Sequence, residues 1–202
     1  IAGETHKVPT PFLVMATQNP IETEGTYPLP EAQVDRFMMK VLVGYPQEDE
    51  EFVIVQRVIG QAIEVAAVTS TDQIAQLQKT CRQGYVDPSL IQFAVKLVSA
   101  TRHPERFGLA DWSRFISFGA SPRATIALIE GARALAFLRG RSYALPQDVL
   151  DLVPDVLRHR LVLSYEALSE GQTPEAIIAQ ILQAVPVPDK PLDSHVRTAP
   201  AA

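Results

Sequence analysis

The segment FLVMATQNPIETEGTYPLPEAQVDRF, residues 12–37, contains three consecutive patterns that determine the predicted fold class. Its first five residues, Phe12–Ala16, form a continuous apolar run, which is typical of a strand covered on both faces. A polar loop follows, and then Pro30 and Glu31 supply the first turn of a short helix. Because Met38–Val43 is a second apolar run, the order strand, helix, strand predicts an α/β portion with an incomplete sheet.

After residue 45 the sequence predicts helices. The pattern Ser70-x-x-Gln73 is a capping box, and other expected helices start with a capping residue or a proline at the first turn. Apolar residues, among them Ile126, Leu128 and Leu138, surround the longest of them, which indicates the centre of a helical bundle. The predicted helices run from about 46 to 59, 70 to 83, 87 to 100, 121 to 140, 146 to 160 and 173 to 184.

These patterns predict three parts of the chain. Residues 1–45 form the α/β portion, and residues 46–185 form a mostly helical domain. The tail, residues 186–202, contains four of the sixteen prolines and is expected to be disordered. IAGETHKV, residues 1–8, resembles half of a β-hairpin, so we expect the chain to be a segment of a longer protein.

The composition excludes several classes of protein. Hydrophobic residues make up 47% of the chain and charged residues 20%, as in ordinary globular domains. No apolar run is long enough to span a membrane. A net charge of −5 argues against nucleic-acid binding, whose surfaces are usually basic. The single cysteine, Cys81, allows no internal disulfide and fits a reducing compartment, so we expect a cytoplasmic protein.

Asn19 and Arg36 are candidate functional residues in the α/β portion. In open α/β sheets, ligands bind beyond the carboxyl ends of the strands, where the Asn19 amide could orient a water molecule or a phosphate oxygen. Asn19-Pro20 could instead simply begin a turn. Arg36, pinned where the chain becomes apolar, could contact two phosphate oxygens, or it could only compensate a helix dipole beside Asp35.

Arg123 is a candidate in the helical domain. It lies in the first turn of its helix, where a cation opposes the dipole at a cost of about 0.3–1 kcal/mol. A bound anion would reverse that effect, although Arg123 could also extend into water at little cost. Arg158–Arg160 is interpreted as a solvated cluster at a helix C-terminus. Glu22 and Glu24 form a weaker candidate for a catalytic pair.

The four histidines lack the spacing of metal ligands, so no metal site is predicted in this chain.

Taken together, several motifs resemble the MoxR family of AAA+ ATPases over about residues 1 to 163. They occur in the same order as in the family, and the residues of this sequence agree with each motif. The motifs are ATQNP (16–20), EGTYPLPEAQ (24–33), DRF (35–37), GASPRA (119–124), LRGR (138–141), PQDV (146–149) and VLRHR (156–160).

The resemblance implies a fold and three residue roles. The fold would be the last strands of an AAA+ core sheet followed by a helical-bundle lid. Asn19 would be sensor 1, which holds the attacking water. Arg36 would be the arginine finger, which acts on the nucleotide of the neighbouring subunit and stabilises charge on the transferring phosphoryl group. Arg123 would be sensor 2, a lid arginine that contacts phosphate.

The chain departs from the family because it has no phosphate-binding loop G-x-x-x-x-G-K-[ST] and no acidic strand end for Mg²⁺. In the family both precede the sensor-1 strand. We therefore expect a C-terminal part of the ATPase module, which would bind no ATP or Mg²⁺ alone, whereas the full-length parent would use both.

The resemblance also implies partners for the parent. It would form a hexameric ring that remodels a client protein. Family members are linked to metalloenzyme maturation and to proteins with von Willebrand factor A domains. Two alternatives stay open: an inactive AAA+-like module that only binds partners, and a DNA-acting AAA+ protein.

Overall fold

The computed structural model describes residues 3–18, 29–61 and 64–188. Their contacts divide the chain into two compact units. The first unit takes the described residues of 1–26 together with 41–80, and the second takes those of 27–40 together with 81–202. The predicted domain boundary near residue 45 stays a prediction. Of the tail expected to be disordered, residues 189–202 lie outside the described residues.

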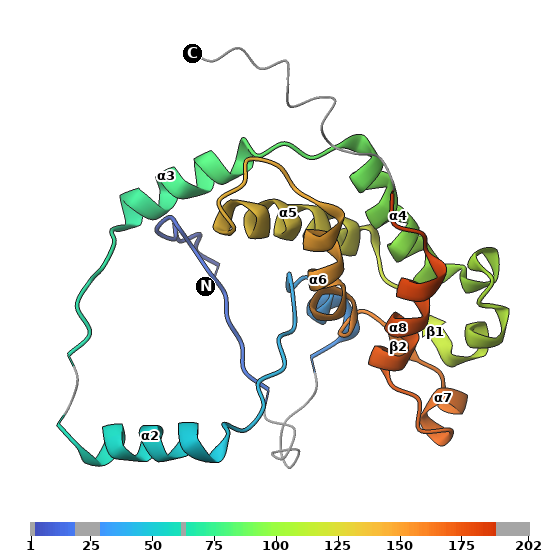
Figure 1. Ribbon diagram of the computed structural model, residues 1–202, viewed down its shortest axis with the longest axis horizontal. Coiled ribbons are helices and arrows are strands. Elements are labelled where there is room, and N and C mark those ends of the chain that lie inside the picture. The colour runs from blue at the N-terminus through green and yellow to red at the C-terminus, as the bar shows by residue number, and fades with distance from the viewer. Residues whose placement is uncertain (1–2, 19–28, 62–63, 189–202) are drawn as a thin grey trace. The chain divides into compact units, whose positions relative to one another are not determined.

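The second unit is predominantly helical (Figure 1). Helix α5 packs against α4 and α6, and α8 also packs against α4 and α6. A two-stranded antiparallel sheet pairs β1 with β2, and Ile116 lies opposite Leu163. The elements are α1 (Glu31–Val34), α4 (Pro88–Arg102), η1 (Pro104–Phe107), η2 (Ala110–Phe115), β1 (Ile116–Phe118), α5 (Pro122–Leu138), α6 (Pro146–Leu157), β2 (Val162–Leu163), α7 (Tyr165–Ser169) and α8 (Pro174–Ala184).

Local capping chemistry explains where these helices begin. The Asp87 carboxylate accepts the Ser89 N–H at 2.8 Å in front of α4. The Thr173 hydroxyl accepts the Ala176 N–H at 3.2 Å in front of α8. Each bond satisfies an N–H that the first turn of the helix leaves without a backbone partner. The predicted starts of these helices are therefore confirmed.

The first unit contains α2 (Glu48–Ile59), and α3 (Thr71–Arg82) lies almost entirely within it. The predicted capping box precedes α3: the Gln73 side chain accepts the Ser70 N–H at 2.9 Å, and the Ser70 hydroxyl accepts the Gln73 N–H at 3.2 Å. Neither helix has a buried residue.

The structure assigns no strand to the apolar runs Phe12–Ala16 and Met38–Val43, so these two strand predictions are wrong. Leu13, Met15 and Val43 are 77%, 82% and 91% exposed. A strand satisfies its backbone groups only through neighbouring strands, and the described residues provide none beside either run. The apolar pattern indicated a tendency to be buried, but it could not supply the strand partners.

The core of the helical unit is contiguous. Leu97, Leu128, Val153 and Ile181 have no exposed surface, and they come from α4, α5, α6 and α8 respectively. Helix α5 is central, as predicted, but apart from Leu128 its buried residues are all small: Ala124, Ala127, Gly131, Ala132 and Ala136.

Two of the large residues on which the prediction for α5 relied are exposed. Ile126 is 63% exposed and Leu138 is 80% exposed. The small residues allow α6 to approach closely. A methyl group added to Gly131 would lie 2.8 Å from the Leu152 side chain, closer than atoms normally pack.

Candidate functional site

A cavity of about 270 Å³ lies in the helical unit, beside the N-terminal half of α5. It brings together side chains from three separate stretches of the chain. Three arginines and two carboxylates leave it with one excess positive charge. Its lining residues are Asp35, Arg36, Met38, Arg123, Ile126, Ala127, Glu130 and Arg160.

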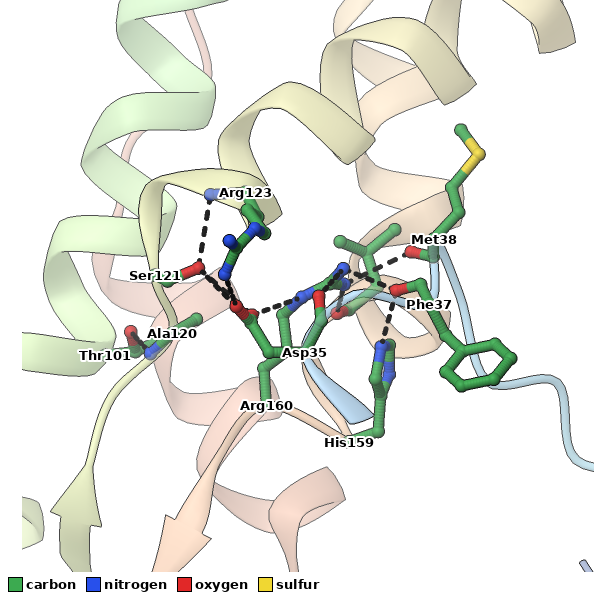
Figure 2. Close-up of polar contacts among 10 residues, drawn as sticks. Asp35, Phe37, Met38, Thr101, Ala120, Ser121, Arg123, His159 and Arg160 are labelled. Carbon is green, nitrogen blue, oxygen red and sulfur yellow. Dashed lines mark hydrogen bonds and ion pairs between the residues drawn. The ribbon is translucent and has the colours of Figure 1, made fainter. Parts of the chain in front are cut away.

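Asp35 lies at the centre of the polar contacts beside this cavity (Figure 2). The Ser121 hydroxyl lies 3.0 Å from each carboxylate oxygen of Asp35. Arg123 donates from Nη1 to Asp35 Oδ2 at 2.9 Å, and Arg160 donates from Nε to Asp35 Oδ1 at 3.1 Å. One carboxylate, immediately after α1, therefore connects the start of α5 to the segment after α6.

This arrangement explains the basic residue in the first turn of α5. Ser121 caps the helix by accepting the Arg123 N–H at 3.2 Å. The Asp35 carboxylate then supplies the anion that a positive helix terminus favours, and it also compensates the Arg123 charge. The sequence left two interpretations of Arg123 open, a bound anion or a side chain extended into water. In the structure that anion comes from the chain itself, while the Arg123 side chain remains 56% exposed.

Arg160 is the most buried arginine of the site, with a side chain only 2% exposed. Besides Asp35 Oδ1, it donates to the backbone carbonyls of Asp35 at 3.0 Å and Phe37 at 2.6 Å, which lie on either side of Arg36. It also donates to the carbonyls of Met38 at 3.1 Å and Val156 at 2.5 Å. A buried guanidinium is stable only when its donors are satisfied, and here they have five acceptors.

The same contacts determine the ionisation of the site. Burial disfavours the charged form of Asp35, but hydrogen bonds from Arg123, Ser121 and Arg160 outweigh it and lower the pKa of the carboxyl. Asp35 is therefore anionic at neutral pH. His159 lies beside it, with Nε2 at 3.1 Å from the Phe37 carbonyl oxygen. Burial lowers the pKa of this imidazole, so it is held neutral.

The candidate residues predicted from the sequence have different outcomes. Asn19, Glu22 and Glu24 lie outside the described residues. Arg36 and Arg123 both line the cavity. Among the described residues, the exposed Arg36 side chain forms no hydrogen bond or ion pair, so its guanidinium is free to bind an anion.

The interpretation of Arg158–Arg160 as a solvated cluster is wrong. The Arg158 and Arg160 side chains are only 10% and 2% exposed. Arg158 donates to the Lys40 carbonyl at 2.6 Å and to Glu175 at 3.0 Å. The basic residues suggested a dipole-compensating helix end, but backbone carbonyl groups of residues 35–40 accept hydrogen bonds from both arginines.

Sequence reasoning also missed the roles of Asp35, Ser121 and Arg160. From the sequence, Asp35 is only the neighbour of Arg36, and Ser121 is only part of the GASPRA motif (119–124). One signal was available, because DRF and VLRHR are both motifs of the resemblance. Two motifs more than a hundred residues apart, one with an acid and one with arginines, could have suggested a direct contact.

What this arrangement can do chemically follows from its charges. Guanidinium groups bind phosphate through planar, paired hydrogen bonds. The cavity is smaller than the roughly 300–1,000 Å³ pockets that enclose whole ligands of drug size. It suits the phosphate end of a nucleotide better than a complete nucleotide. The described residues contain no cluster of histidine, cysteine, aspartate or glutamate suited to a metal ion.

Comparison with known proteins covers both parts of the chain. Residues 112–181 match the model of the AAA lid domain, and residues 1–39 match the model of the ATPase family associated with various cellular activities (AAA). These matches agree with the predicted fold class, the α/β end of an AAA+ core followed by a helical lid.

Three of the similar proteins have names that indicate a family or an activity. The chain is 49% identical to chaperone MoxR1 of Mycobacterium tuberculosis, over 93% of this chain and 50% of that protein. It is 34% identical to protein MoxR of Paracoccus denitrificans, over 87% of this chain and 56% of that protein. A crystal structure from Cytophaga hutchinsonii, named as a presumed ATPase, superposes with a TM-score of 0.88 and 40% identity, over 94% of this chain and 58% of that one. The chain thus spans about half the length of the curated relatives it matches.

Proposed function

Because the chain belongs to the MoxR family of AAA+ ATPases, we propose that it supplies the lid and the nucleotide-sensing arginines of a chaperone-like motor that couples ATP hydrolysis to remodelling of a client protein. A relative named as a chaperone and another named MoxR support this function. In this proposal the complete protein is cytoplasmic, forms a ring of six subunits, and uses ATP and Mg²⁺. The chain alone hydrolyses no ATP, because it has no G-x-x-x-x-G-K-[ST] loop.

The observation that carries the proposal is the shared cavity of Arg36 and Arg123. Two guanidiniums beside one cavity can contact different oxygens of one phosphoryl group. During transfer, negative charge spreads over those oxygens, and fixed cations stabilise it. The resemblance implies that Arg36 acts on the nucleotide of the neighbouring subunit and that Arg123 contacts phosphate. Their common cavity favours one nucleotide for both, supplied by the neighbouring subunit.

Residues around the two arginines have distinct roles in this proposal. Arg36 is unpaired within the described residues and is ready to bind, whereas Arg123 is held by Asp35 at 2.9 Å until a phosphate competes for it. Asn19 would orient the attacking water as sensor 1. ATP supplies the phosphoryl group, and this chain supplies charge, orientation and the lid surface.

Steady-state ATP hydrolysis by the complete protein tests the proposal. We expect Arg36→Ala to lower kcat by about 10³-fold or more, in the range that loss of an arginine finger produces. Arg123→Ala should also lower kcat, because it removes the second cation. Arg106→Ala is the matched control, since Arg106 is exposed on η1 and does not line the cavity.

Each result of this assay has a defined meaning. Full activity in Arg36→Ala and Arg123→Ala, with normal ring assembly, would refute the proposed roles. A comparable loss in Arg106→Ala would show that removing any lid arginine is harmful, and would remove the support for a specific site.

A further inference from the structure

We infer that Arg160 is a positioning residue for Arg36: through the Asp35 carboxylate and the carbonyls on both sides of Arg36, it fixes the backbone from which that arginine reaches the cavity. The inference rests on the proposed function of Arg36. It goes beyond that function because it assigns a role to a buried residue that contacts no nucleotide in the proposal.

The first argument is the pattern of acceptors. Arg160 donates to the carbonyls of Asp35 and Phe37 at 3.0 and 2.6 Å, the residues immediately before and after Arg36 (Figure 2). A third carbonyl, that of Met38, accepts at 3.1 Å. Because the carbonyls of three of the four residues 35–38 are bonded to one guanidinium, the backbone around Arg36 has little freedom, while the Arg36 side chain stays free.

The second argument is local stability. Helix α1 has only four residues, Glu31–Val34, and none is buried. A helix of that length is not stable by itself, because nucleation costs more than a single turn recovers. The segment therefore depends on contacts from elsewhere in the helical unit. The Arg160 contacts provide them, together with the Lys40 N–H, which donates to the Asp155 carbonyl at 2.8 Å.

The third argument is that a second arginine shares the same carboxylate. Asp35 also binds Arg123 at 2.9 Å and the Ser121 hydroxyl at 3.0 Å, both at the start of α5. Displacement of the segment that follows α6 would therefore alter Arg36 and Arg123 together. Arg160 thus connects the position of the lid helices to both phosphate-binding arginines of the proposal.

The first test is a double-mutant cycle on ATP turnover by the complete protein, with Arg160→Lys, Arg36→Ala and the double variant. Lysine keeps the charge but cannot reach five acceptors in a planar arrangement. We expect Arg160→Lys alone to lower kcat by about 10- to 100-fold, the scale of a misplaced catalytic group, with little change in KM. In the Arg36→Ala background the same change should lower the residual kcat by a smaller factor, since only the effect through Arg123 remains.

The second test needs no turnover. Hydrogen exchange of the complete protein should become faster in the peptide covering residues 33–40 in Arg160→Lys, while the amides of α4 keep their protection. Arg141→Lys is the matched control: it weakens another arginine, bound at 2.6 Å to the buried Asp148, and should leave exchange at residues 33–40 unchanged.

Two outcomes would overturn the inference. One is an equal loss of kcat in both backgrounds, which indicates a general structural effect. The other is unchanged exchange at residues 33–40, which shows that Arg160 does not hold the segment. Wild-type protein without any turnover would contradict the proposed function instead, and the exchange result would then decide the positioning role alone.

Discussion

At the scale of single residues, the Asp35 carboxylate illustrates how much of the site depends on contacts between distant parts of the chain. Its three side-chain partners, Ser121, Arg123 and Arg160, lie 86 to 125 positions away in the sequence. The sequence suggested that Arg36 and Arg123 could bind phosphate, since each is a cation in an unusual local position. The residues near Asp35 could not indicate its role, because nothing in them distinguishes a buried network from a surface ion pair.

His159 gives a prediction about pH at this scale. Burial is the main effect on its imidazole in the folded protein, and it lowers the pKa. The positive charges of Arg160 and Lys40 lower this pKa further, whereas the Phe37 carbonyl and the Asp35 carboxylate raise it. The unfolded chain has a histidine pKa of about 6.5. As the pH falls through that value, the unfolded state binds a proton that the folded state does not. The free energy of unfolding should therefore fall between pH 7 and pH 5.

Denaturant unfolding at several pH values measures this contribution. His159→Gln, which can still donate to the Phe37 carbonyl, should show a smaller decrease in unfolding free energy over this pH range than wild type. His103→Gln is the control, since the His103 side chain is 45% exposed, and it should keep the wild-type pH dependence. An identical pH dependence in wild type and His159→Gln would contradict a buried, neutral His159.

At the scale of elements, the sequence predicted helices well and strands poorly, for a physical reason. A helix satisfies its own backbone and has local start signals, such as Asp87-Pro88 for α4 and Ser121-Pro122 for α5. A strand depends on partners elsewhere in the chain. The short ladder between β1 and β2 was not predicted, because two or three residues leave no clear periodic pattern.

Helix α5 allows a direct comparison between its inner and outer faces. Leu128 has no exposed surface, whereas Leu138 on the same helix is 80% exposed. We expect Leu128→Ala to lower the free energy of unfolding by about 2–5 kcal/mol, since it leaves a cavity in the core. Leu138→Ala should change it by less than about 0.5 kcal/mol. Chemical denaturation of both variants checks this, and similar losses would mean that the orientation of α5 is wrong.

At the scale of the whole molecule, the family assignment and the predicted lid are the parts that sequence reasoning established most completely. Ordered motifs such as GASPRA (119–124) and VLRHR (156–160) identified the family before any contact was known. The motifs did not show that Arg36 and Arg123 line one cavity, because that depends on how α1 and α5 lie in the helical unit. Among the described residues, no helix has the length and apolar character needed to cross a membrane.

A nucleotide-bound structure of the assembled, complete protein would test the central claim most directly. The measurement is the distance from the Arg36 and Arg123 guanidiniums of one subunit to the phosphate oxygens of the nearest nucleotide. Our account predicts that both lie within hydrogen-bond distance, about 2.7–3.2 Å, of the same nucleotide, bound by the neighbouring subunit. Guanidiniums that contact two different nucleotides, or none, would contradict it.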